Sequence, residues 1–371
     1  MKKILFIFGT RPEAIKMAPL IKELTSRKEK FDVKVCVTGQ HKEMLYQVLD
    51  FFAIRPDYDL EVMKQDQTLF GVTAAIFSKL EPILDEVKPD VMLVQGDTTS
   101  VLVGAIGAFY KQIKVGHLEA GLRSGDMYSP FPEEMNRVLT SRITDYHFAP
   151  TSRAEKVLFE EGVKNEKVFN VGNTVIDALL LGVDLVKNDN SKYADYFKDI
   201  DFSKRVVLVT GHRRESIGEG FYNMFNAVKR IAEDYKDVEI VYPVHLNPNV
   251  RKPVNEILSG IDNVHLIDPL DYPYLIWLME KSYLVLTDSG GIQEEAPTLG
   301  KPVLVMREVT ERQEGVEAGT AKLVGTSEDV IYSETKQLLD SKDEYGKMAN
   351  AINPYGDGTT SRQIADILEK R

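Results

Sequence analysis

Apolar and polar positions along the chain form blocks that predict strands and helices in turn. Short apolar runs of roughly four to eight residues are typical of buried strands, and apolar residues three or four apart are typical of amphipathic helices. In the first half the pattern predicts strands at 4–8, 31–37, 90–94, 114–118 and 167–171. In the second half it predicts strands at 206–210, 238–244, 263–267, 283–287 and 302–306. Helical patterns follow most of these strands, so we expect two parallel, doubly wound α/β sheets.

The length of 371 residues also favours two domains over one core. The alternation loosens after residue 173 into a helix and a polar segment at 187–204, which is typical of a connection between domains. We therefore predict a first domain at 1–172 and a second at 173–355. In such sheets ligands bind outside the carboxyl ends of the strands, so two facing sheets would place one ligand in the cleft between them.

Composition narrows the class of protein. Hydrophobic content of 43% and charged content of 28% are those of a soluble globular protein. The net charge of -11 argues against a nucleic-acid partner, although a few local arginines and lysines can still hold a small anion. Cys36 is the single cysteine, which excludes a disulfide framework and a thiolate metal cluster. The apolar run after Lys3 is too short for a signal peptide, and no segment is apolar for long enough to cross a bilayer. We expect a cytoplasmic protein with no membrane insertion.

The stretch 117–137 holds the densest group of candidate residues. It carries four carboxylates beside Arg123 and Arg137, interleaved with glycines, prolines and aromatics, and we predict a loop shaped around a ligand. Glu119 and Glu133 are the candidate proton carriers, because carboxylates held close together can exchange protons with a substrate. The alternative is that they form salt bridges to Arg123 and Arg137.

Two further motifs end strands of the first domain. Gly9-Thr10-Arg11 leads into a helix, where free backbone N–H groups favour an anion, and Arg11 and Lys16 add positive charge. A tight turn with solvated charges is about equally expected. Asp97, in QGDTTS, should lie at the carboxyl edge of the sheet, or else cap the next helix, for which Thr98 or Thr99 is also placed.

Two motifs in the second domain bear charge or glycine at strand ends. His212 is followed by Arg213 and Arg214, which favours a charged site over a structural histidine. Ser289-Gly290-Gly291 opens a predicted helix and is typical of a phosphate cradle, with Glu295 a turn further on and able to bind sugar hydroxyls. Arg312 could supply a further phosphate contact. The histidines, His245 among them, lack the spacing of a zinc site.

Together these motifs resemble the UDP-N-acetylglucosamine 2-epimerases, and more closely the bacterial non-hydrolysing type. The resemblance runs in order along nearly the whole chain through GTRPEAIKMAPL, GQHKEML, VQGDTTS, HLEAGLRSGDMYSPFPEEMNRVLT, VGNTVIDALL, GHRRES, HLNPNVRKP, DSGGIQEEAPTLGKPVLVMR, TER and NPYGDG. It implies the glycosyltransferase-B architecture, with two Rossmann-like domains and a last segment, 356–371, that returns as a helix to the first domain.

The resemblance also implies roles for individual residues. The residues that match the family's chemistry are Asp97, Glu119, Glu133, Arg137 and His212. Those that match its substrate contacts are Arg11, Lys16, Leu275, Ser289, Gly290, Gly291, Glu295 and Arg312, with the uracil along a loop at 272–275 held mainly by backbone. An activator site for a second UDP-GlcNAc would involve Gln40, Gln67, Glu134, Arg213 and His245.

The expected reaction interconverts UDP-GlcNAc and UDP-ManNAc for surface-polysaccharide precursors. The family is understood to eliminate UDP, giving 2-acetamidoglucal, and to add it back while a proton returns to the other face of C2. Such a route suits cations on the leaving diphosphate and carboxylates on both faces of one carbon. It requires no redox cofactor and no metal.

The chain departs from the family pattern at four positions. Gly211 and Ser216 stand where many relatives have alanine and asparagine, Gln313 where proline is common, and Asp66 where some members have arginine. Asp66 bears on the activator site, so activation by UDP-GlcNAc remains a hypothesis. The alternatives are a hydrolysing epimerase that releases ManNAc and UDP, a glycosyltransferase of the same fold, and a UDP-sugar sensor. We expect a homodimer, as for related members.

Overall fold

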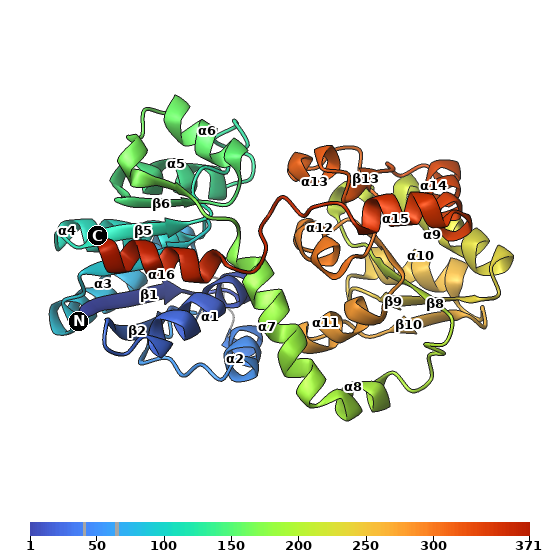
Figure 1. Cartoon of the computed structure of the whole chain (residues 1–371), viewed down its shortest axis with the longest axis horizontal. Helices are drawn as coiled ribbons and strands as arrows, with labels where there is room; N and C mark the ends of the chain where they lie inside the picture. The colour runs from blue at the N-terminus through green and yellow to red at the C-terminus, as the bar shows by residue number, and fades with distance from the viewer. Residues whose placement is uncertain (40–41, 64–66) are drawn as a thin grey trace. The chain divides into compact units, whose positions relative to one another are not determined.

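The computed structural model describes residues 1–39, 42–63 and 67–371. The chain divides into two compact units, one of Met1–Leu180 with Tyr355–Arg371 and one of Leu181–Pro354. The first division falls within helix α7 (Thr174–Asn188) and the second between Pro354 and Tyr355. Each unit has its own parallel sheet flanked by helices, as the colours of Figure 1 allow the reader to follow.

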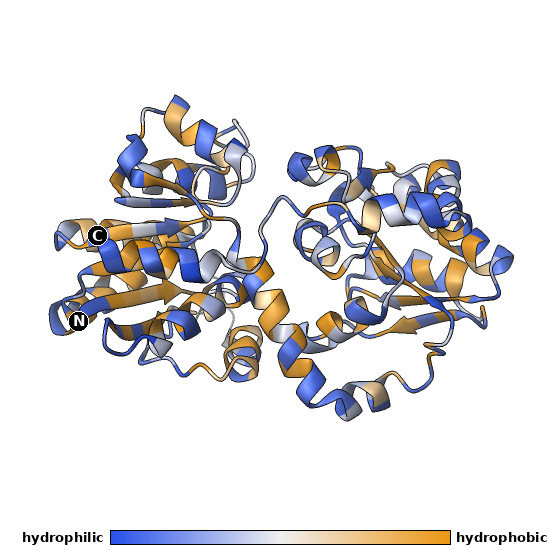
Figure 2. Cartoon of the chain, viewed as in Figure 1, coloured by the Kyte–Doolittle hydropathy of each residue, from blue (hydrophilic) through white to orange (hydrophobic). Residues whose placement is uncertain are grey.

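The sheet of unit 1 has seven strands in the order β3-β2-β1-β4-β5-β6-β7, with every neighbouring pair parallel. Residues 4–8 of β1 are fully buried, because helices cover a central parallel strand on both faces, and this strand is orange along most of its length in Figure 2. The strands are β1 (Lys2–Phe8), β2 (Phe31–Val37), β3 (Tyr58–Asp59), β4 (Val91–Gln95), β5 (Lys114–Leu118), β6 (Tyr146–Ala149) and β7 (Val168–Asn170).

The helices of unit 1 connect these strands, and the last one comes from the end of the chain. Helix α16 packs beside α1, where Lys2 Nζ donates to the carbonyl of Leu368 at 2.6 Å and Arg27 pairs with Asp366 at 2.6 Å (Figure 1). The helices are α1 (Arg11–Ser26), α2 (Lys42–Phe51), α3 (Leu69–Val87), α4 (Thr99–Tyr110), α5 (Glu133–Ile143), α6 (Ser152–Glu160), η1 (Asn165–Lys167) and α16 (Thr360–Lys370).

The sheet of unit 2 has six parallel strands in the order β10-β9-β8-β11-β12-β13. They are β8 (Arg205–Thr210), β9 (Val238–Pro243), β10 (Val264–Ile267), β11 (Leu284–Thr287), β12 (Val303–Val305) and β13 (Ala321–Leu323). The helices are α8 (Asn190–Tyr196), η2 (Arg214–Ser216), α9 (Glu219–Asp234), α10 (Pro248–Leu258), α11 (Tyr272–Lys281), α12 (Gly290–Glu295), η3 (Ala296–Leu299), α13 (Gln313–Glu317), α14 (Glu328–Asp340) and α15 (Lys342–Ala349).

The order of strands reverses direction once in each sheet. The reversal falls between β1 and β4 in unit 1 and between β8 and β11 in unit 2. Loops leaving two such strands diverge to opposite faces of the sheet, and ligands of doubly wound proteins bind at this point. The motifs with Arg11, Asp97, His212 and Ser289 all follow these four strands, so they lie at the edge where doubly wound sheets commonly bind ligands.

The structure confirms the predicted fold class of two parallel α/β sheets and corrects two predicted loops. Glu133 begins helix α5, so the stretch 117–137 is a loop only in part. The buried face of α5 carries Glu134, Asn136, Thr140 and Ser141, and the apolar periodicity that predicts a helix is therefore absent. The stretch 272–275 is the first turn of α11, with Pro273 near its start, where proline suits a helix. Within the described residues, no helix is both long and apolar enough to span a bilayer.

Candidate active site

Glu13, which the sequence analysis did not single out, organises the turn after β1. Its buried carboxylate accepts hydrogen bonds from the backbone N–H groups of Gly9 at 3.0 Å and Thr10 at 2.8 Å, and from the Thr98 hydroxyl at 2.8 Å. Burial raises its pKa, and these hydrogen bonds oppose the rise. Thr10-x-x-Glu13 is a capping-box sequence, so the signal was available. Because two N–H groups are occupied, an anion at this turn depends chiefly on the half-buried side chain of Arg11.

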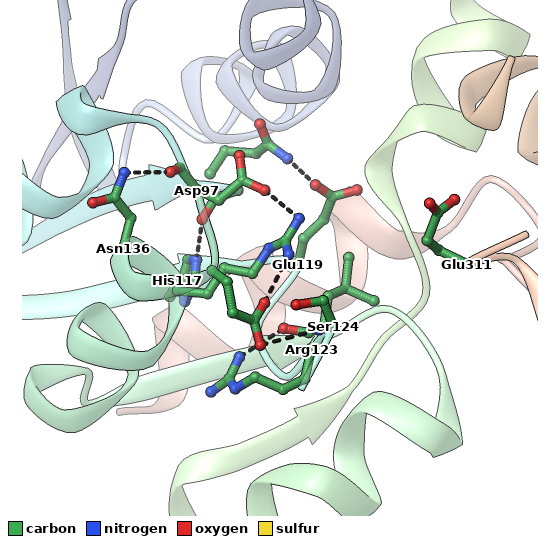
Figure 3. A network of polar contacts seen from close by, with 12 residues as sticks. Asp97, His117, Glu119, Arg123, Ser124, Asn136 and Glu311 are labelled. Atoms are coloured by element: carbon green, nitrogen blue, oxygen red, sulfur yellow. Dashed lines mark hydrogen bonds and ion pairs between the residues drawn. The ribbon is translucent and has the colours of Figure 1, made fainter. Parts of the chain in front are cut away.

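Asp97 lies just after β4, where three neighbouring side chains hold it and the preceding Gly96. Its carboxylate is 2.5 Å from the guanidinium of Arg137, and its carbonyl accepts from Asn136 Nδ2 at 2.8 Å. The preceding carbonyl, of Gly96, accepts from His117 Nε2 at 2.7 Å (Figure 3). Burial lowers the pKa of His117 to about 4, so this imidazole is neutral near pH 7. The side chain of Thr98 caps helix α4, which confirms one of the two predicted caps. The Asp97 side chain is therefore not needed to cap this helix.

Glu119 follows the adjacent strand, β5, in a strained backbone conformation with φ at 62°. Its carboxylate pairs with Lys16 at 2.5 Å and accepts from Asn173 Nδ2 at 2.8 Å and from the amide of Gln95. A side chain at Gly96, where φ is 78°, would bring its Cβ within 3.7 Å of this carboxylate. A non-glycine residue at positive φ persists only where its surroundings hold it, and such strain is common at active sites.

The first turn of α5 supplies a further carboxylate, that of Glu134. It accepts from the N–H groups of Ser124 at 3.0 Å and Gly125 at 3.2 Å, and pairs with Arg137 at 2.9 Å. Burial acts to raise the pKa of Glu134, but the hydrogen bonds from Ser124 and Arg137 outweigh it and lower the pKa. Arg137 therefore bridges Glu134 and Asp97. Glu133, which directly precedes Glu134 on α5, is half-buried.

The salt bridges considered as an alternative for Glu119 and Glu133 are replaced by other pairs. Arg123 pairs with Glu161 at 2.8 Å, and Arg137 pairs with Asp97 and Glu134. Lys16, expected near the diphosphate, is the ion-pair partner of Glu119. In unit 1 the structure thus joins Asp97, Glu119, Lys16 and Arg137 at two neighbouring strand ends.

In unit 2, the turn after β8 carries His212 against the end of β11. The backbone N–H groups of His212 and Arg213 donate to the buried Asp288 at 2.6 and 2.7 Å. The His212 ring stacks on that of His245, with 5.2 Å between centroids and 10° between planes. Burial lowers the pKa of His212, and the negative charge of Asp288 opposes this. Two residues predicted for an activator site, Arg213 and His245, are therefore direct neighbours of His212.

Ser289, Gly290 and Gly291 begin the short helix α12 at the end of β11. A Cβ at Gly290 would lie 3.3 Å from the guanidinium carbon of Arg312, so glycine here lets that side chain approach the start of the helix. Arg312 is oriented by the buried Glu294, whose carboxylate accepts from Nε at 2.8 Å. Gly290 thus has a structural reason to be glycine.

Glu295 ends the same helix with its carboxylate buried against Tyr272, whose hydroxyl donates to it at 2.7 Å. Burial raises the pKa of Tyr272 well above its ordinary range. The N–H of Leu275 donates to the carbonyl of Asp271 at 3.0 Å, so it is used within α11. Backbone contacts from this segment would therefore come from the first turn of a helix rather than from a loop.

Arg307, which the sequence analysis also did not single out, links the loop after β8 to the loop after β12. Its buried guanidinium donates to Glu215 at 2.6 Å, beside the histidine motif, and to Glu311 at 3.0 Å, beside Arg312. Burial acts to raise the pKa of Glu311, yet the bond from Arg307 holds that pKa at about 2. A single arginine in a strand-end motif gives no sequence signal for such a bridge.

The departures from the family pattern are accommodated locally. A Cβ at Gly211 would meet Met224 and Tyr242 at 3.4 Å, an ordinary contact, so alanine would also fit. Gln313 begins α13 and its amide donates to the carbonyl of Thr310 at 2.7 Å.

The remaining predicted activator residue, Gln67, precedes α3 and is half-buried, whereas Gln40 and Asp66 lie outside the described residues. Across 1–39, 42–63 and 67–371 we find no group of three or more His, Cys, Asp or Glu side chains arranged to hold a metal ion.

Two parallel α/β units, each with charged residues at its strand-reversal point, have the architecture of the glycosyltransferase-B-like fold. A family model for UDP-N-acetylglucosamine 2-epimerase matches residues 22–369. The UDP-N-acetylglucosamine 2-epimerase of Escherichia coli K12 is 54% identical over 370 residues, 99% of this chain and 98% of that protein. The chain belongs to the UDP-N-acetylglucosamine 2-epimerase family, and these similarities support that epimerase function.

Solved structures give the same result. The Neisseria meningitidis UDP-GlcNAc 2-epimerase bound to UDP-GlcNAc matches with a TM-score of 0.90 and 49% identity, over 100% of both chains. The Methanocaldococcus jannaschii enzyme in complex with UDP-GlcNAc and UDP matches with a TM-score of 0.80 and 34% identity, again over 100% of both chains.

Proposed function

We propose that this chain interconverts UDP-GlcNAc and UDP-ManNAc by elimination and re-addition of UDP, without release of the free sugar. The C1–O bond breaks and UDP leaves with the bonding electrons, while a base removes the proton from C2 to give 2-acetamidoglucal. The UDP oxygen then re-forms the bond to C1 while an acid delivers a proton to the opposite face of C2. Atoms and electrons balance with no net oxidation.

The observation that carries this proposal is the pair Asp97 and Glu119. They end neighbouring strands, and each is paired with its own cation, Arg137 or Lys16, at 2.5 Å. Two carboxylates in separate environments suit proton transfer at two faces of one carbon, whereas a transferase has no evident need for both. Glu133, next to the Arg137 network, is the third candidate.

The leaving diphosphate is assigned to the cations and glycines. Arg11 of unit 1, and His212, Arg312 and the Ser289-Gly290-Gly291 turn of unit 2, would stabilise its developing charge. Glu295 would bind the ribose hydroxyls, with the first turn of α11 up to Leu275 beside the uracil. Two hydrogen bonds support this assignment. Glu294 orients Arg312, and Tyr272 orients Glu295.

One experiment separates this reaction from its alternatives. The protein is incubated with UDP-GlcNAc in D2O, and C1 and C2 of the sugar are followed by NMR. We expect UDP-ManNAc with deuterium at C2. Free ManNAc with UDP would identify a hydrolysing epimerase instead, and an unchanged substrate, with UDP binding verified by calorimetry, would point to a sensor.

The homodimer is part of the proposal. Phe70 on α3 is 89% exposed, and Phe109 and Tyr110 at the end of α4 are 57% and 73% exposed. Aromatic residues gathered on two adjacent helices are typical of a surface that a partner covers. Sedimentation should give a dimer, and Phe109→Ser with Tyr110→Ser should shift it toward monomer. Location in the cytoplasm remains a prediction.

Activation by a second UDP-GlcNAc is a separate part of the proposal. Glu134 and His245 are built into the networks of Arg137 and His212, so a ligand touching them would act directly on candidate catalytic groups. A sigmoidal or UDP-GlcNAc-dependent rate from UDP-ManNAc is expected. A hyperbolic rate with UDP-ManNAc alone would exclude it.

A further inference from the structure

Asp288 occupies a position that the motif comparison left without a role. It follows β11 directly, where Thr287 pairs in register with Thr210 of β8, so Asp288 lies against the turn that carries His212. Its own N–H continues the ladder by donating to the carbonyl of Thr210 at 3.2 Å. The side chain is fully buried. A buried carboxylate is costly unless it is hydrogen-bonded or paired, so its contacts require an explanation.

One carboxylate oxygen is fully used and the other is not. Oδ2 accepts the N–H groups of His212 and Arg213 at 2.6 and 2.7 Å, which fixes the backbone of the turn. Oδ1 is buried without a hydrogen-bond partner among the described residues, and it lies 3.6 Å from Nδ1 of His212. The free oxygen therefore faces one nitrogen of the imidazole.

The ring of His212 is held from a second side. It stacks on His245 with planes 10° apart, and its side chain remains 44% exposed. Because Nδ1 is turned toward the protein, Nε2 is the nitrogen left for a ligand. The charged and titratable groups around the ring are Asp288, His245 and Arg213. Of these, only Asp288 favours a positive imidazole.

We propose that Asp288 is a positioning residue for His212, which holds the ring as the Nδ1–H tautomer and stabilises the imidazolium that forms when a diphosphate reaches Nε2. The logic is that of a carboxylate behind a catalytic histidine, here combined with backbone clamping by the same side chain. This inference rests on the proposed function, in which His212 contacts the leaving diphosphate.

The first test needs no variant of Asp288 and no turnover. The full chain is labelled with ¹⁵N-histidine, and the ring nitrogens are observed without ligand at a pH where the imidazole is neutral, with His212→Gln used to assign the signal. We expect the proton of His212 on Nδ1. A proton on Nε2 in the wild-type protein would overturn the inference, even if the protein proves to be an active epimerase.

The second test removes the charge while keeping the shape. In Asp288→Asn the amide oxygen can still accept the two backbone N–H groups, but an N–H now faces Nδ1, so the ring should change to the Nε2–H tautomer. The pKa of His212 should fall, because the imidazolium loses a nearby opposite charge. The matched control is Glu239→Gln, which changes another buried carboxylate paired with a histidine, His265, at 2.5 Å in the same unit.

The two variants should also differ in their kinetics and in UDP binding. Asp288→Asn should shift the pH dependence of kcat for epimerisation and weaken UDP binding several-fold, whereas Glu239→Gln should leave both at wild-type values. An unchanged His212 tautomer and pKa in Asp288→Asn would contradict the inference. If the tautomer changes as expected but the wild type does not epimerise, the proposed function fails and the positioning role stands.

Discussion

The ammonium of Lys16 lies 2.5 Å from the carboxylate of Glu119, although 103 residues separate them in the chain. Lys16 belongs to α1 and Glu119 follows β5, so this ion pair joins the two sides of the strand-order reversal in unit 1. The pair is nearly buried, with the two side chains 15% and 9% exposed. We therefore propose that Lys16 holds Glu119 in place, and its predicted contact with the diphosphate stays a prediction.

Lys16→Met should lower kcat by about 100-fold, because Glu119 loses the cation that orients it for proton transfer. UDP affinity should change much less, since the phosphate contacts are assigned to other residues. Steady-state kinetics and calorimetry with UDP measure the two effects. Lys22→Met, on the same helix, is the control and should behave as wild type. A large loss of UDP affinity with unchanged kcat would return Lys16 to the diphosphate.

Asp97→Asn and Glu119→Gln should each reduce epimerisation by about 10²- to 10⁴-fold while leaving UDP binding measurable, because both groups are assigned to proton transfer. Glu133→Gln tests whether the third predicted carboxylate takes part. Deuterium incorporation at C2 in each variant shows which step is lost. Loss of UDP affinity in both Asp97→Asn and Glu119→Gln would instead indicate a binding role.

Stability should fall in mild acid because of buried histidines. Burial and the neighbouring His117 lower the pKa of His147 to about 3, against about 6.5 in an unfolded chain. Below pH 6.5 the unfolded chain therefore binds a proton that the folded chain refuses, so the stabilisation is complete above that pH and is lost as the pH falls toward 3. In His147→Gln the difference in unfolding free energy between about pH 7 and pH 5.5 should be smaller by about 1 kcal/mol.

Urea unfolding at the two pH values measures this difference. His245→Gln, which changes an exposed imidazole, is the control and should keep the wild-type difference. An equal change in both variants would assign the effect to something other than burial.

Arg307→Met should destabilise unit 2 by about 2 kcal/mol, because it removes the charge-assisted hydrogen bonds from the buried guanidinium to Glu215 and Glu311. This is the lower end of the usual cost, since both carboxylates are more than half exposed to water. Arg251→Met, which breaks an exposed pair with Asp268, should cost less than about 1 kcal/mol. Urea unfolding compares them, and equal losses would show that Arg307 is not a special link between the two loops.

The sequence by itself determined the fold class and which motifs carry charge. Short apolar runs followed by amphipathic patterns are local signals, and they predicted most strands and helices of both sheets. Polar residues directly after those runs, such as Asp97, His212 and Ser289, had to lie at the carboxyl edges, because that follows from a parallel sheet alone. The resemblance to the epimerase family rests on the same residues.

Helix α5 and the pairing of charges were decided only by the tertiary structure. The face of α5 that packs inward is polar, so no periodic pattern of apolar residues predicted this helix. Which of Glu133 and Glu134 meets Arg137 depends on the helical turn, and the partner of Lys16 depends on how β5 lies beside β4. The contact of Asp288 with the His212 turn could not be predicted from the sequence either, since only the pairing of β11 with β8 brings its carboxylate next to that turn. Side chains distant in the chain become partners through strand order, and strand order is not a local property of the sequence.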